Sequence, residues 1–183
     1  MHKLRNLIAI LAALLLSGGA FAQVRNEIES LLAALKVAPD EQIAGELERR
    51  LRDQWLKAGS PATTVLLRRS MRDIASHDVD SALENLNSAL LLDPDLTEAY
   101  YRRALARFDA GDFNSALADL QETLRREPRH FLALQSLSRM AESRKDWKGA
   151  LEAFKRCLTF DPKTPGGAER LLMLEKKLNG ESL

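Results

Sequence analysis

Apolar residues follow a helical period along most of the chain, beginning a little after residue 22. Between residues 24 and 38 they recur every three or four positions, and a second such stretch begins after Asp40. Asp40 is a suitable N-terminal cap for the second helix, and Gly59-Ser60-Pro61 stops it. Residues 23–60 are therefore predicted to form a helical hairpin with one apolar face to bury. That face consists of Ile28, Leu31, Leu32, Leu35, Ile43, Leu47, Leu51 and Trp55.

From residue 63 onward the pattern repeats with a period of 34 residues, in three blocks: 63–96, 97–130 and 131–164. A fixed period of this size is typical of a repeat array, in which each unit packs on its neighbours. Each block has an alanine after its mid-block turn and ends with an acidic residue and a proline. These positions are Ala82, Ala116 and Ala150, and Asp93-Pro94, Glu127-Pro128 and Asp161-Pro162.

The second block shows how one unit is built. Its first helix is predicted from Thr97 to about Ala110, Gly111 allows the turn, and Asp112 caps a second helix that runs to Arg126. Two helices that cross closely need small residues at the crossing. These positions are Ser70, Ala104 and Ser138 on the first helices, and Ala82, Ala116 and Ala150 on the second helices.

Residues 63–164 resemble the tetratricopeptide repeat family, whose pattern combines aromatic, leucine, small and proline positions. The matching residues are Leu66, Ser70, Ala82, Leu86 and Pro94; Tyr100, Ala104, Ala116, Leu120 and Pro128; and Leu134, Leu137, Ser138, Ala150, Phe154 and Pro162. The departures lie on first helices, where Arg69 and Arg103 replace leucine, and Asp73 and Arg107 replace an aromatic residue. The resemblance implies an all-α solenoid of helical hairpins with three repeats.

Both flanks of the array are predicted to be helical. After Pro165-Gly166-Gly167, a helix from Ala168 to about Leu178 presents Leu171, Leu174 and Leu178 on one side, so residues 165–183 are expected to form a C-terminal capping helix and tail. The hairpin of residues 23–60 has two interpretations. It is either a cap on the first repeat or a surface for dimerisation or docking centred on Trp55.

The first 22 residues have the three parts of a secretory signal peptide: a basic start, an apolar run from Leu7 to Leu16, and the triplet Ala20-Phe21-Ala22. The run is about half of the roughly 20 residues that cross a bilayer. We therefore expect cleavage between Ala22 and Gln23, no stable membrane anchor afterwards, and a periplasmic or secreted protein.

Charge and cysteine content narrow the function classes further. Without residues 1–22 the chain has 25 basic and 26 acidic residues, a net charge near −1. A surface for nucleic acid or anionic lipid needs clustered positive charge, so neither partner is expected. Cys157 has no second cysteine with which to form an internal disulfide, so packing must stabilise this chain.

No catalytic or metal-binding pattern is found in the sequence. His77 falls in a mid-block turn and His130 lies between blocks, and no metal-ligand spacing, phosphate loop or nucleophile motif is present. Cys157 aligns with Ala89 and Thr123, which indicates a small residue facing inward rather than a nucleophile. We expect a protein that is not an enzyme and that has no cofactor.

A protein or peptide partner is the remaining expectation. The resemblance implies that the first helices line a concave groove, apolar early and polar late. The groove residues carried over are Leu67, Met71, Ile74, Tyr101, Arg102, Leu105, Phe108, Gln135, Arg139 and Glu142. An amphipathic segment with one acidic group would suit this groove, with Arg102 and Arg139 facing the acid and Tyr101 and Phe108 holding the apolar part.

Two alternatives to this expectation are considered, and one binding mode of the family is absent. The hairpin of residues 23–60 could itself fill the apolar part of the groove. A structural homo-oligomer or assembly chaperone, joined through the hairpin or the C-terminal helix, is the other function considered. The lysine and asparagine clamp by which some family members grip a C-terminal carboxylate is absent, because only Arg102 could bind an acid among the matching positions. Those positions are Leu67, Met71, Arg102, Leu132 and Ser136.

Overall fold

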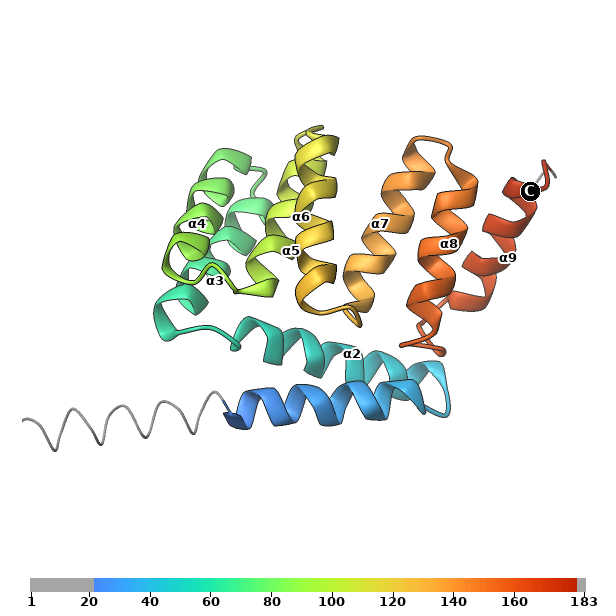
Figure 1. Cartoon of the computed structure of the whole chain (residues 1–183), viewed down its shortest axis with the longest axis horizontal. Coiled ribbons are helices and arrows are strands. Elements are labelled where there is room, and N and C mark those ends of the chain that lie inside the picture. Colours follow the sequence, from blue (N-terminus) through green and yellow to red (C-terminus); the bar gives the residue numbers. More distant parts are fainter. Residues whose placement is uncertain (1–21, 181–183) are drawn as a thin grey trace, which may run out of the picture.

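The computed structural model describes residues 22–180, so the predicted signal segment lies outside the described residues except for Ala22. Within this range every regular element is a helix (Figure 1). The first helix covers residues 22–36. The others are α2 (Glu41–Leu56), α3 (Pro61–Ala75), α4 (Val79–Leu92), α5 (Thr97–Asp109), α6 (Phe113–Arg126), α7 (Phe131–Ser143), α8 (Trp147–Leu158) and α9 (Gly167–Leu178). The fold is the all-α solenoid of helical hairpins that the sequence predicted.

Side-chain caps fix where most of these helices begin. Asp40 accepts a hydrogen bond from the Ile43 amide at the start of α2, and Asp112 accepts one from Ser115 at the start of α6, as predicted. Asp78 and Asp146 do the same for α4 and α8, so the second helix of every repeat begins with an aspartate cap. Such a cap satisfies one of the free amides of the first turn.

The turn inside each repeat uses a left-handed residue at the same position. Gly111 has φ +81°, His77 has φ 62° and Lys145 has φ 60°. Glycine takes this conformation freely, whereas a side chain makes it unfavourable by about 1 kcal/mol. The sequence indicated a turn in all three repeats, but it indicated the left-handed conformation for Gly111 only, because histidine and lysine carry no comparable signal.

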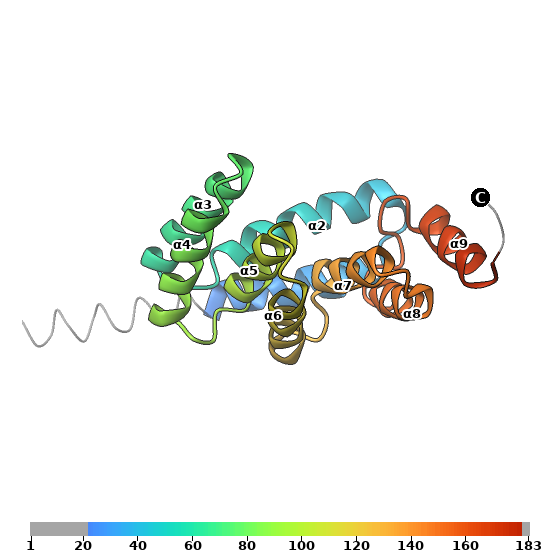
Figure 2. The ribbon, with the colours of Figure 1, turned by 90° about the horizontal axis from the view of Figure 1, so that it is seen from above.

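The repeats stack so that α3, α5 and α7 lie on the side toward α2, and α4, α6 and α8 lie on the opposite side (Figure 2). The small residues predicted at the helix crossings are all buried: Ser70, Ala104 and Ser138, and Ala82, Ala116 and Ala150. Their size lets the paired helices approach closely, while larger apolar side chains such as Leu86, Leu120 and Phe154 fill the space beside them.

Two departures from the family pattern are explained by a buried carboxylate. Asp119 of α6 accepts from Arg103 at 2.9 and 2.8 Å and from Arg107 at 2.7 Å. The two arginines that replace leucine and an aromatic residue thus share one buried counter-ion. In the first repeat, Asn85 occupies the position of Asp119 and donates to Asp73 at 2.8 Å. The polar residues of the two helices therefore match each other in the first and second repeats, whereas the third has Ala141 and Ala153 at the equivalent positions.

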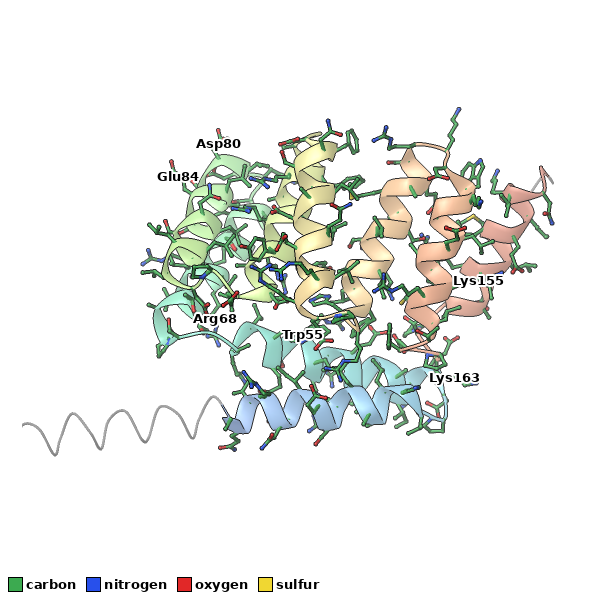
Figure 3. The ribbon with its side chains drawn as sticks, viewed as in Figure 1. Trp55, Arg68, Asp80, Glu84, Lys155 and Lys163 are labelled. Carbon is green, nitrogen blue, oxygen red and sulfur yellow. The ribbon has the colours of Figure 1, made fainter. Side chains whose placement is uncertain are left out.

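The sequence left two interpretations of the hairpin open, a cap on the first repeat or a surface centred on Trp55. The first is wrong, because the hairpin does not cap the first repeat. It runs across the lower ends of the array helices (Figure 1), and its apolar face packs with the third repeat and α9. Trp55 lies between α2 and the array (Figure 3) and is buried, so a docking surface centred on its exposed ring is also excluded. The hairpin residues of this core are Ile28, Leu31, Leu32, Leu35, Ala38, Ala44, Leu51 and Trp55.

At the other end, α9 covers the third repeat as expected of a terminal helix. Leu174 is fully buried in the shared core, and Arg170 donates to Glu142 of α7 at 2.8 Å. Lys155 of α8 pairs with Glu175 at 2.9 Å. Leu178, which was predicted to belong to the buried stripe, is instead exposed.

Candidate binding pocket between the second and third repeats

A pocket of about 220 Å³ opens between α5, α6 and α7, where the second repeat meets the third. Its wall is mainly apolar, with polar groups at the rim. The lining residues are Ala104, Leu105, Phe108, Asp109, Leu120, Ser136, Arg139 and Met140. A volume below the range of about 300–1,000 Å³ of small-molecule sites suits an inserted side chain better than a cofactor.

The apolar wall keeps part of its surface in water. Leu105 and Phe108 of α5 are half-buried, while Met140 of α7 and Leu120 of α6 close the base. Phe108 is held edge-on by Phe113, with ring centroids 5.4 Å apart. Aromatic side chains in a half-buried setting bring a large apolar area to a partner at little cost in conformational entropy.

Arg139 supplies the positive charge at the rim. Its guanidinium donates to Ser136 Oγ at 3.1 Å, and within residues 22–180 no carboxylate lies at salt-bridge distance from it. The side chain is exposed, so its charge is available to an acidic group of a partner. A guanidinium can bind a carboxylate through two parallel hydrogen bonds.

Only three of the ten predicted groove residues line this pocket: Leu105, Phe108 and Arg139. Leu67 is fully buried in the core of the first repeat, and Tyr101 is only 5% exposed, which corrects the expectation that they face a partner. Met71 and Ile74 lie on α3, away from the pocket, and are half-buried.

The other predicted polar residues already have partners. Arg102 donates to Glu98 at 2.6 Å, which corrects its expected role as a free cation. Glu142 pairs with Arg170 of α9, and Gln135 donates to Thr164 Oγ1 at 3.0 Å. Repeat alignment placed these side chains on the right helices, but it could not show which of them another part of the chain would cover or neutralise.

The burial of Tyr101 follows from a series of stacked rings. His130 lies 4.7 Å from the Tyr101 ring and 4.1 Å from the Trp55 ring, measured between centroids. Through His130, one hairpin residue, Trp55, supports the packing around Tyr101. Burial raises the pKa of the Tyr101 hydroxyl, with the Glu98 charge adding to the effect.

Glu98 is the buried carboxylate beneath these rings. Burial pushes its pKa up, but Arg102 and His130 outweigh that effect and hold the pKa below its ordinary value. The group is therefore ionised and occupied by its neighbours. One oxygen of the Glu98 carboxylate faces Arg102 and the other faces His130. The carboxylate is therefore part of the packing of this junction and is not free to bind a ligand.

Five pocket residues were not predicted as site residues: Ala104, Asp109, Leu120, Ser136 and Met140. Met140 aligns with Ala106 and Arg72 of the earlier repeats, so a large apolar residue appears there only in the third repeat. The sequence therefore contained a signal that Met140 differs from the equivalent residues of the other repeats. Ala104 and Leu120 occupy positions that the repeat pattern uses for packing, whereas Ser136 aligns with Arg68 and Arg102, and Asp109 aligns with Ala75 and Ser143.

A larger cleft of about 580 Å³ lies between the first helix, the end of α2 and the turns around residues 93–98 and 126–129. Two of its arginines, Arg126 and Arg129, are already paired with carboxylates. Arg129 donates to Glu29 at 2.8 and 2.7 Å and to Glu127 at 2.8 Å, and Arg126 is bound by Glu122. This cleft offers less to a charged partner than the pocket beside Arg139.

Cys157 is buried against the hairpin. Burial, together with the nearby Asp161 charge, raises the pKa of the thiol to about 12. A thiol that stays protonated is a poor nucleophile and metal ligand, so the position serves packing. In the described residues no group of three or more histidine, cysteine or acidic side chains could hold a metal ion. None of the described helices is both long and apolar enough to span a membrane.

The fold is a helical-hairpin solenoid, and it is similar to the fold of tetratricopeptide-repeat domains. Residues 101–165 match the family model described as tetratricopeptide repeat. A TPR repeat-containing protein of Rhizobium etli is 28% identical over 161 residues, which cover 88% of this chain and 79% of that protein.

Solved structures have the same fold. The first TPR domain of Spaghetti, bound to an HSP90 peptide, superposes with a TM-score of 0.61 at 17% identity, covering 66% of this chain and 96% of that domain. The MamA protein superposes with a TM-score of 0.58 at 18% identity, covering 86% of this chain and 84% of its own.

Proposed function

We propose that this protein is a non-enzymatic interaction scaffold of the bacterial cell envelope, and that it binds a segment of a partner protein in the pocket between α5, α6 and α7. The observation that carries the proposal is the half-buried apolar wall of Leu105 and Phe108 beside the guanidinium of Arg139, which no carboxylate of the described residues neutralises. The Spaghetti domain, whose fold this chain shares, is bound to an HSP90 peptide. Envelope location rests on the signal-peptide pattern of residues 1–22.

The pocket defines the chemistry of the partner segment. One apolar side chain enters between the repeats, and an acidic group nearby meets Arg139. Buried apolar anchors supply most of the affinity in such interfaces, whereas an exposed ion pair mainly sets orientation and rate of association. A helical or extended segment that places both groups on one side satisfies the pocket.

A random peptide library displayed on phage tests the chemistry directly. Selected peptides are expected to share an apolar residue with an aspartate or glutamate close by. Arg139→Glu should weaken their binding at least tenfold, whereas Arg156→Glu, on an exposed face of α8, should leave it unchanged. Peptides without an acidic residue, or with equal affinity for both variants, would refute the site.

Photo-crosslinking in intact cells tests the site and the location together. A photoreactive residue at position 105 is expected to trap partners that a photoreactive residue at exposed position 156 does not. Mass spectrometry of the same protein should show Gln23 as its first residue, and cell fractionation should find it outside the cytoplasm. Retention of residues 1–22 on a cytoplasmic protein would overturn the envelope assignment while leaving the pocket untouched.

A further inference from the structure

The outer face of α3 is left open at the start of the array. Val65, Arg68, Arg69 and Arg72 follow one another along this helix at intervals that place them on one side. Val65 is 50% exposed, and the three arginines are exposed as well. The opposite side of α3, which carries Leu67, is buried in the core of the first repeat. The helix therefore has one packed face and one basic face in water.

The equivalent face of α5 is covered by the preceding repeat. Ala99 and Ala106 stand at the positions of Val65 and Arg72, and both are fully buried. They share a core with three residues of α4: Leu86, Ala89 and Leu90. The pair α3 and α4 lies at one end of the repeat stack (Figure 1), and the hairpin packs against the third repeat. Hence no described helix takes the place on α3 that α4 takes on α5.

Arg68 lacks the counter-ion of its equivalent in the second repeat. Arg102 stands at the same position of α5 and donates to Glu98 at 2.6 Å. In the first repeat Thr64 takes the place of Glu98, so no carboxylate lies one turn before Arg68. The first repeat thus has the cation without the acid.

Arg69 differs from its equivalent in the same way. Arg103 donates to Asp119 at 2.9 and 2.8 Å, and to Asn87 of the preceding α4 at 2.7 Å. Asn85 takes the place of Asp119 in the first repeat, so the carboxylate is again replaced by a neutral side chain. The second repeat neutralises its arginines itself, whereas within residues 22–180 the three arginines of α3 have no salt-bridge partner.

The positive charge is confined to a strip along α3. From residue 74 to residue 101 the chain contains no lysine or arginine. Arg68 lies on α3, whereas Asp80 and Glu84 project from the neighbouring α4 (Figure 3). Asp73, the single acid of α3, already accepts from Asn85. A nucleic acid or an anionic membrane needs a broad basic surface. A narrow strip of cations on a helix instead matches carboxylates that lie one turn apart on a second helix.

We propose that the outer face of α3 binds an acidic amphipathic helix of a partner protein, which packs on α3 as α4 packs on α5. Small apolar side chains of that helix cover Val65 and the aliphatic stems of the arginines, and its carboxylates pair with the three guanidinium groups. The partner helix thereby stands where a preceding repeat would stand. The face lies outside the Arg139 pocket, so the inference does not depend on the proposed function.

A helical peptide taken from this chain is a suitable probe. Residues 78–95 contain α4, which already covers the equivalent face of α5, and a hydrocarbon staple on the exposed side keeps the isolated helix folded. Because Asn87 accepts from Arg103, the same packing on α3 places position 87 against Arg69. The acidic probe carries Asn87→Glu, and its matched control carries Asn87→Lys.

Fluorescence anisotropy with labelled peptides measures binding to the whole protein. The acidic probe is expected to bind at least tenfold more tightly than the lysine peptide, and salt should reduce the difference. Arg69→Glu in the protein should reverse the preference, because the charges at this contact are then exchanged. Equal affinity of the two peptides, no binding of either, or an unreversed preference in Arg69→Glu would each overturn the proposal.

Two triple variants separate the α3 face from charge in general. All of the changed side chains are exposed, so helicity should be preserved. The first variant carries Arg68→Gln, Arg69→Gln and Arg72→Gln, and it should lose the preference for the acidic probe. The control changes three basic residues of the third repeat and should keep that preference: Arg144→Gln, Lys148→Gln and Arg156→Gln. The same preference in both variants would refute the site.

Vesicles of phosphatidylglycerol test the competing partner. Flotation of the wild-type protein with these vesicles is expected to be no greater than that of the α3 triple variant. Flotation that requires the α3 arginines, together with equal affinity for the two peptides, would assign this face to a membrane surface and overturn the proposal.

Discussion

The indole of Trp55 lies flat on the imidazole of His130, with ring centroids 4.1 Å apart and planes inclined by 11°. Trp55 belongs to α2, whereas His130 caps α7 by accepting from the Ala133 amide at 3.1 Å. The contact joins the hairpin to the junction of the second and third repeats. It therefore places the hairpin against the same junction that forms the candidate pocket.

Trp55→Ala is expected to lower the free energy of unfolding by about 3–5 kcal/mol, because a large buried aromatic side chain is replaced by a cavity. Denaturant unfolding followed by circular dichroism measures the change. Val37→Ala, on a largely exposed residue of the same hairpin, should shift the free energy by no more than about 0.5 kcal/mol. A small effect of Trp55→Ala would mean that the hairpin is not fixed by this stack.

Asp161 makes stability depend on pH. The carboxyl is buried, and neither oxygen has a hydrogen-bond partner among residues 22–180. Burial and the adjacent Glu48 carboxylate raise its pKa from 3.8 to about 8, so the folded protein binds a proton that the unfolded chain releases. Its favourable contribution is complete below about pH 4 and is lost as the pH rises to about 8.

Asp161→Asn should therefore stabilise the protein relative to wild type, by an amount that grows between about pH 4 and about pH 8 and is constant above. An amide can donate to Glu48 as the protonated acid would, without carrying charge. Thermal unfolding across this range measures the difference. Asp80→Asn, on an exposed acid of α4, should show no such trend, and parallel curves for wild type and Asp161→Asn would contradict the assignment.

The left-handed turn residues give a third prediction. His77→Gly and Lys145→Gly should each raise the free energy of unfolding by about 0.5–1 kcal/mol, because glycine adopts a positive φ without a steric penalty. Gly111→Ala, at the equivalent position of the second repeat, should lower it by about 1 kcal/mol. Chemical denaturation of the three variants measures whether the free energy of unfolding rises for the two glycine variants and falls for Gly111→Ala. A loss of stability in both glycine variants would show that these turns are not strained.

The buried Arg103–Asp119–Arg107 group gives a fourth prediction. Asp119→Ala should lower the free energy of unfolding by about 3 kcal/mol, because two largely buried guanidinium groups lose their counter-ion. A triple variant with Arg103→Leu, Arg107→Tyr and Asp119→Ala restores the residue types of the family pattern and should recover most of that stability. Equilibrium unfolding compares the two. Failure of the triple variant to recover stability would mean that the repeat has adapted its packing to the charged group.

Much of the fold was predictable because it depends on local order in the sequence. The 34-residue period located every helix pair, and Asp112 and Gly111 marked the cap and turn of the second repeat. Small residues such as Ala104 and Ala116 identified the crossings, and all of these positions are buried. Such signals are local because a helix, its cap and its partner helix are close along the chain.

The site was less predictable because it depends on contacts between distant residues. Repeat alignment assigned Tyr101 to an open groove, but Tyr101 is buried against His130, which in turn stacks on Trp55. Arg102 carries the charge expected of a binding residue, yet Glu98 neutralises it. Nothing in the local pattern of the hairpin shows that it packs on the third repeat rather than the first. Of the predicted residues, only Leu105, Phe108 and Arg139 line the pocket.

The position of the hairpin has a consequence for how the protein folds. In an open array each repeat contacts its neighbours alone, so stability is nearly a sum over units and an end can fray independently. Here Thr164 donates to Glu48 across 116 residues of sequence, and Arg129 pairs with Glu29 across 100. These contacts raise the contact order and tie early and late segments into one cooperative unit. We therefore expect all-or-none unfolding and slower folding than local helix pairing alone would give, with no single repeat removable without loss of the whole.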